Sequence, residues 1–235
     1  MNEENGKKLA RPAEVARDRI LTGILSGAYP PGSALPPERD LALTVGVTRP
    51  TLRETLHGLA AEGWLSIRQG KPTLVNDYWK EGGLRLLSAM ARYFQYLPPD
   101  FVGHLLNLRL DLVPAMAVRA AANAPEALLA HLALAENLPD DAGAYTAFDW
   151  ELHRLMAERS GNPLFSMIVN DFTPVFSTLA RFYFETPEGR ASSSAYYRDL
   201  FRAVRGENGG VAAVVRAVME ESIRLWEGLQ GGAPA

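Results

Sequence analysis

The chain has 235 residues, a length that suits two domains of ordinary size, and 47% of them are hydrophobic, enough to build a real core. It contains no cysteine, which excludes a disulfide framework and thiol chemistry. The net charge of −3 is divided unevenly, because residues 1–80 carry 11 basic and 9 acidic side chains whereas the remainder carries 13 and 18.

The apolar runs are shorter than a membrane span, and the N-terminal residues MNEENGKKLARP are too polar for a signal peptide. These features predict a cytoplasmic protein that does not enter a membrane. The weakly positive N-terminal part would bind a polyanion through local geometry and dimer avidity rather than through bulk charge.

Residues 35–63 predict two short helices joined by a tight turn. Pro36–Arg39 is typical of a helix start, because proline suits the first turn and Glu38 lies near the positive end of the helix dipole. Gly46 is expected to end this helix in the left-handed conformation. The apolar stripe of the helix consists of Leu41, Ala42 and Val45.

The second helix is predicted from Arg49 to Gly63, with Thr48 as its N-cap. Its inward stripe comprises Leu52, Leu56 and Leu59. The residues left on its outer face are Arg49, Thr51, Arg53 and His57. Recognition helices contact bases through their N-terminal residues, and arginine and threonine suit guanine edges, thymine methyls and phosphates.

A small β-hairpin is predicted directly after this helix, with strands in Trp64–Arg68 and Thr73–Asn76 and a basic tip at Gln69–Pro72. A helix-turn-helix that runs into a hairpin is a winged helix, and its tip can reach a groove beside the helix. The alternative is a charged, solvated face on a small packing domain. The predicted DNA contacts are Arg39, Thr48, Arg49, Thr51, Arg53, Gln69, Gly70 and Lys71.

The rest of the chain predicts helices separated by proline and glycine breakers, so the expected fold is mainly α. We place a winged helix-turn-helix domain in residues 1–78 and an all-α antiparallel helical bundle for an effector in residues 79–235. Pro114 and Pro174 lie inside helical patterns and should kink them. The predicted helices are Leu84–Tyr96, Pro99–Ala122, Pro125–Asn137, Ala142–Ser160, Pro163–Phe184, Pro187–Arg205 and Val211–Leu229.

The winged-helix residues resemble the GntR superfamily of bacterial regulators. The matching segments are GAYPPG at 27–32, LPPER at 35–39, VTRPTLRE at 47–54 and LAAEG at 59–63. Later segments are similar to the FadR group of that superfamily, which regulates fatty acid metabolism. These segments are Gly70–Trp79, Gly83–Leu87, Ser160–Pro163 and Arg181–Arg190. At the wing tip this chain has Gln69 where that group has histidine, and Pro50 replaces a threonine.

The FadR resemblance implies a homodimer on a palindromic DNA operator that long-chain acyl-CoA releases. It also implies repression of fatty acid degradation genes and activation of unsaturated fatty acid synthesis genes. An acyl chain needs an apolar tunnel with polar groups for the head. Arg109 is expected to meet a phosphate or carboxylate, and Tyr183 and Tyr197 to bond a thioester or head group. The candidate tunnel residues are Leu105, Leu106, Leu108, Phe148, Phe172, Phe176, Phe182 and Trp226.

The last predicted helix carries a segment that the resemblance links to the ligand response. The family has glycine, any residue, glutamate and serine there, followed by tryptophan, and this chain keeps Glu221, Ser222 and Trp226. Met219 stands in place of the glycine and Glu220 in place of a histidine. A methionine is bulky and flexible, so we expect Met219 to narrow the cavity.

A second hypothesis is a metal site for small carboxylates, as in related regulators of the FCD type. Asp149 and His153 have the helical spacing of two metal ligands. Residues 187–229, which should supply the other ligands, contain no histidine, so we predict no metal and no cofactor. Asp149 is expected to pair instead with a buried cation, Arg198 or Arg109. Because nucleophile elbows, phosphate loops and zinc-protease motifs are missing, we predict no catalytic residues and no enzyme activity.

Overall fold

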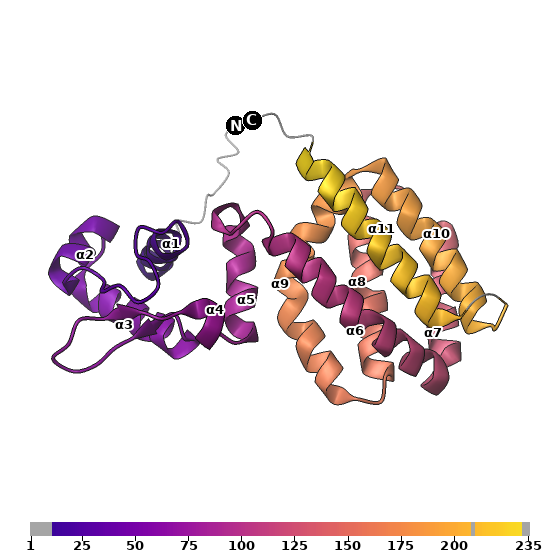
Figure 1. Ribbon diagram of the computed structural model, residues 1–235, viewed down its shortest axis with the longest axis horizontal. Coiled ribbons are helices and arrows are strands. Elements are labelled where there is room, and N and C mark those ends of the chain that lie inside the picture. Colours follow the sequence, from indigo (N-terminus) through magenta and orange to yellow (C-terminus); the bar gives the residue numbers. More distant parts are fainter. Residues whose placement is uncertain (1–10, 208–209, 232–235) are drawn as a thin grey trace, which may run out of the picture. The chain divides into compact units, whose positions relative to one another are not determined.

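The computed structural model describes residues 11–207 and 210–231 (Figure 1). The chain divides into two compact units, one that ends at Leu97 and one that begins at Pro98. Each unit has its own core and is described by itself.

The first unit contains three helices, α1 Pro12–Leu25, α2 Glu38–Val45 and α3 Arg49–Glu62. The turn between α2 and α3 is the predicted one, because Gly46 has a φ of 69° and the Thr48 hydroxyl accepts a hydrogen bond from the Thr51 amide. The apolar stripes of the three helices form one core. Its helical residues include Ile20, Leu21, Leu41, Val45, Leu52, Leu56 and Leu59.

A bidentate ion pair connects helix α3 to α1. The Arg17 guanidinium donates to both oxygens of Glu62, at 2.7 and 2.6 Å. Arg19 of α1 also donates to the Val45 carbonyl at the end of α2, at 3.0 Å. A bidentate pair combines charge with a planar geometry, so the Arg17–Glu62 pair fixes the angle between α1 and α3.

The predicted hairpin is present, with antiparallel strands β1 Leu65–Ser66 and β2 Leu74–Val75. Both strands are shorter than expected. The chain leaves the pairing after Ser66 and turns at the tip, where the Lys71 amide donates to the Arg68 carbonyl and Gly70 has a φ of 71°. A bond from the Ser66 hydroxyl to Asn76, at 2.7 Å, closes the base of the wing.

Three further short segments belong to the first unit, α4 Tyr78–Glu81, α5 Leu84–Met90 and the 3-10 helix η1 Ala91–Tyr96. The structural division therefore falls later than the predicted boundary after residue 78. The reason is tertiary, since the Tyr93 hydroxyl donates to Asp18 of α1. The single helix predicted over 84–96 is interrupted, because Tyr93 has non-helical φ and ψ of −122° and 25°.

The second unit is a bundle of helices, as predicted. Its elements are α6 Phe101–Asn123, α7 Pro125–Ala133, the 3-10 helix η2 Leu134–Asn137, α8 Ala142–Arg159, α9 Pro163–Glu185, α10 Pro187–Val204 and α11 Val211–Gly231. Prolines occupy the first turns of α7, α9 and α10, and side chains of Asp141, Asn162 and Thr186 cap α8, α9 and α10. Helices α6 and α9 continue through Pro114 and Pro174.

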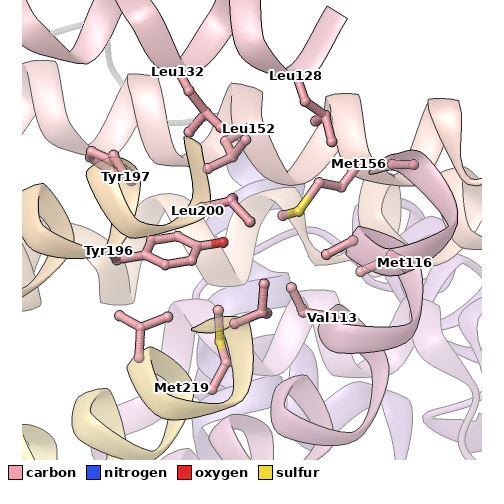
Figure 2. Close-up of a cluster of buried hydrophobic side chains, with 14 of the residues drawn as sticks. Val113, Met116, Leu128, Leu132, Leu152, Met156, Tyr196, Tyr197, Leu200 and Met219 are labelled. Carbon is pink, nitrogen blue, oxygen red and sulfur yellow. The ribbon is translucent and has the colours of Figure 1, made fainter. Parts of the chain in front are cut away.

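The core of the bundle is formed mainly by α6, α8, α10 and α11, with Leu128 and Leu132 of α7 and Val169 and Phe184 of α9. Figure 2 shows Leu152 and Met156 of α8 beside Leu200 of α10, with Val113 and Met116 of α6 nearby. Helix α6 is long and apolar enough to cross a membrane by composition alone. It supplies Val113, Met116, Ala117 and Ala120 to this core, as a core helix of a globular bundle does.

Candidate functional site

The predicted DNA-contact residues form the surface of the winged helix. Burial of Leu52, Leu56 and Leu59 turns the opposite face of α3 outward, so Arg49 and Arg53 are exposed in its first turns. Thr48 and Arg39 are exposed beside them, and Thr51 is half-buried, with its hydroxyl 2.9 Å from that of Thr48. The wing tip of Gln69, Gly70 and Lys71 is exposed as well. This surface has donors suited to phosphates and base edges.

Acidic side chains hold two of these arginines in place. The Arg53 Nε lies 2.6 Å from a Glu38 oxygen of α2, and the Arg39 Nε lies 2.9 Å from Asp40. A guanidinium has five N–H donors. Each ion pair uses the Nε–H, so the other N–H groups remain available to donate to phosphates or base edges. Glu38 therefore orients Arg53 across the two helices of the motif.

Glu38→Gln should raise the affinity for DNA of arbitrary sequence by about two- to fivefold, because it removes an anion that competes with phosphate for Arg53. The preference for a selected operator over arbitrary DNA should fall, because Arg53 is no longer held in one orientation. Fluorescence anisotropy with both duplexes at several salt concentrations measures these quantities.

Glu54→Gln provides the matched control, since it removes the same charge from the exposed face of α3. It should raise affinity for both duplexes without changing their ratio. Equal ratios for the two variants would show that the charge of Glu38 matters and its contact with Arg53 does not.

The second unit encloses a cavity of about 140 Å³. Helix α6 packs on α8 and α11, and α9 packs on α8 and α10, so the cavity lies where α6 and α9 face each other. Its wall is mainly apolar. The apolar wall residues include Val102, Leu105, Leu106, Leu108, Leu112, Val113, Ile168, Phe172, Val175, Phe176, Leu179 and Trp226.

A polar group stands at one part of this wall, centred on Arg109 of α6. Its guanidinium donates to the Ser222 hydroxyl of α11 at 3.0 Å and approaches the Met219 sulfur at 2.7 Å. The Ser222 hydroxyl in turn donates to the Met219 carbonyl, at 2.7 Å. Arg109 thus links α6 to α11 across the cavity wall, and Met219 lies beside it in that wall.

Asp149 and His153 of α8 are buried side by side in the wall of the cavity, but the partner of Asp149 is not the expected one. The carboxylate accepts a hydrogen bond from the Tyr197 hydroxyl at 3.0 Å, whereas Arg198 is exposed and Arg109 bonds to α11. The His153 Nδ1 lies 2.8 Å from the Asp149 carbonyl and 3.5 Å from its carboxylate. Burial lowers the pKa of His153, so its ring is neutral near pH 7.

The structure brings most of the predicted effector residues to one cavity. Arg109, Asp149, Tyr183, Met219, Ser222 and Trp226 line it. Two others do not, since Tyr197 points to Asp149 and Glu221 pairs with Arg224 on the surface of α11. Among the predicted tunnel residues, Phe148 packs in the core and Phe182 is exposed.

Tyr196 is a wall residue that the sequence analysis did not single out. Neighbouring positions on a helix point about 100° apart, so either tyrosine of the pair 196–197 suits the core by pattern alone. Only the packing of α10 shows that Tyr196 is turned to the cavity.

The metal hypothesis finds no support in the described ranges, which contain no group of three or more His, Asp or Glu side chains able to hold an ion. The His153 Nε2 is buried without a hydrogen-bond partner there, but a single ring nitrogen beside one carboxylate does not make up a metal's ligand set.

A winged helix with an arginine-bearing recognition helix, followed by a helical unit with an apolar cavity, defines a DNA-binding regulator with an effector domain. Comparison with known families agrees with this class. Residues 12–75 match the bacterial regulatory proteins of the gntR family, and residues 76–235 match the FadR C-terminal domain. The chain therefore belongs to the FadR family, the GntR-type transcriptional regulators of fatty acid metabolism.

Curated relatives include the fatty acid metabolism regulator proteins of Yersinia pestis and Serratia proteamaculans, each 36% identical over 97% of this chain and 96% of the relative. Among solved structures, Lar, which controls the agr system of Listeria monocytogenes, matches with a TM-score of 0.56 and 18% identity over 92% of this chain and 95% of Lar. That likeness supports the fold alone. These relatives and families are transcription regulators, a class that is typically without enzymatic activity.

Proposed function

We propose that this regulator binds a palindromic operator as a cytoplasmic homodimer and that long-chain acyl-CoA releases it. In this role it represses fatty acid degradation genes and activates unsaturated fatty acid synthesis genes. One observation carries the choice of effector. The cavity of the helical unit is walled by leucine, valine, isoleucine and phenylalanine side chains, and its few polar groups are gathered around Arg109. An alkyl chain with one polar end suits such a wall.

The size of the cavity suggests how binding is coupled to release. About 140 Å³ is much smaller than the several hundred Å³ of sites that enclose large ligands. A long acyl chain must therefore push α6 and α9 apart. Helix α6 begins at Phe101, directly after the point where the chain leaves the first unit. Displacement of α6 by the acyl chain is therefore a physical route by which the effector can lower the affinity of the first unit for DNA.

Oleoyl-CoA, kept below its micellar concentration, should displace the protein from an operator selected from random DNA by the wild-type chain. Fluorescence anisotropy measures the release, and isothermal calorimetry should give about one site per chain. Coenzyme A and hexanoyl-CoA carry the same head group but bury much less apolar surface, so they should release little protein from the operator. Release by coenzyme A alone would contradict an acyl-chain site.

A pair of variants locates the binding. Ala180→Phe places a ring in the wall of the cavity and should abolish the response, whereas Ala147→Phe adds the same ring to the exposed face of α8. An oleoyl-CoA response that survives Ala180→Phe would place the effector elsewhere.

A further inference from the structure

The cavity wall contains a buried hydroxyl that has no hydrogen-bond partner. Tyr196 of α10 is 4% exposed, and its hydroxyl is unpaired among the described residues. Figure 2 shows the ring reaching from α10 into the cluster formed with Val113 and Met219, with the hydroxyl at its inner end. Leaving a buried hydroxyl unpaired costs free energy, so this position favours a ligand atom that can take up the hydrogen bond.

A second donor at the same wall has only a weak partner. The Arg109 Nε points to the sulfur of Met219, and a thioether sulfur is a poor acceptor. An oxygen atom that reached this place would take the hydrogen bond from the sulfur. Because Met219 is unbranched and flexible, it can withdraw without disturbing the helix that carries it.

The cavity wall beside these donors carries one acidic and one basic side chain, Asp149 and Arg109, and the buried His153 ring next to them is neutral. The site therefore lacks the surplus of positive charge that a buried carboxylate would need, and a neutral acceptor fits better.

We propose that the Tyr196 hydroxyl and the Arg109 Nε form a subsite for the carbonyl oxygen of an acyl group whose chain lies along the apolar wall. This inference rests on the proposed effector and specifies where its reactive end is held. A thioester and a free fatty acid both present such an oxygen. The balanced charges assign the subsite to the neutral carbonyl of the thioester.

The test compares palmitoyl-CoA with S-hexadecyl-CoA, a thioether in which a methylene replaces the carbonyl. Both ligands have the same chain length and the same head, and palmitate is the third ligand. The quantity measured is the ratio of the two coenzyme A ligands' dissociation constants, in the wild type and in Tyr196→Phe. Comparing ratios removes the different hydration of the two ligands. The ratio should shift against palmitoyl-CoA by about 3- to 10-fold in Tyr196→Phe.

Tyr145→Phe is the matched control. Tyr145 is also a buried tyrosine of this unit, but its hydroxyl lies 3.1 Å from Ser194 and it does not line the cavity. The ligand ratio should stay unchanged in this variant. The melting temperatures without ligand should show the reverse pattern. Tyr145→Phe loses a hydrogen bond and should melt at a lower temperature than the wild type, whereas Tyr196→Phe loses none and should keep the wild-type melting temperature.

The outcomes separate the subsite from the proposed effector. An unchanged ratio in Tyr196→Phe, or a melting temperature as low as that of Tyr145→Phe, overturns the subsite and leaves acyl-CoA as the effector. Binding of palmitate alone, weakened by Tyr196→Phe, would show that the Tyr196 hydroxyl bonds an acyl oxygen, but it overturns the assignment of that oxygen to a neutral coenzyme A thioester. Failure of all three ligands to bind the wild-type chain overturns both proposals.

Discussion

Arg49→Ala should weaken binding to the selected operator by about 5- to 150-fold, a loss of roughly 1–3 kcal/mol. Arg49 is the first residue of α3 and is exposed, and the N-terminal residues of a recognition helix are those that reach base edges. Because its side chain takes no part in the core, the variant should keep the wild-type unfolding midpoint. Anisotropy titration and thermal denaturation measure the two quantities.

Arg154→Ala controls for the loss of one positive charge. Arg154 is a half-buried residue of α8 that pairs with Glu151 and Glu158, far along the chain from the winged helix. It should bind the operator as the wild type does. Operator affinity that is equal in Arg49→Ala and Arg154→Ala would show that α3 does not enter the groove by its first turn.

Trp64→Ala should lower the free energy of unfolding of the first unit by about 3–5 kcal/mol. Trp64 is 0% exposed and follows the Gly63 cap of α3, and its carbonyl accepts from the Asn76 amide at the base of the wing. Its ring also packs at 5.5 Å from that of Tyr78. The variant keeps the backbone bond to Asn76 but loses the buried indole and its packing against Tyr78.

Hydrogen exchange of α1–α3 amides measures this loss in the first unit, with the second unit as an internal standard. Trp79→Ala removes the same side chain at a position that is 51% exposed and should cost much less. A small effect of Trp64→Ala would mean that the core of the winged helix closes over the space that the indole leaves.

Local chemistry determined much of the fold from the sequence alone. Gly46, Thr48 and the prolines at 125, 163 and 187 set helix ends to within a residue or two, because caps and first turns depend on near neighbours in the chain. The wing strands and the segment 84–96 were less well predicted. Their ends depend on Gly70 at the tip and on the bond of Tyr93 to Asp18, which lies far away in the sequence.

The same division holds for the candidate sites. The exposed arginines of α3 follow from the apolar stripe on its other face, so the sequence by itself determined which side chains this helix presents at its surface. The cavity was decided by tertiary structure. Asp149 pairs with Tyr197, and Tyr196 rather than Tyr197 faces the cavity, because the rotation of α10 against α8 sets both directions. Periodicity identifies a buried face, but the partners on that face come from helices distant in the chain.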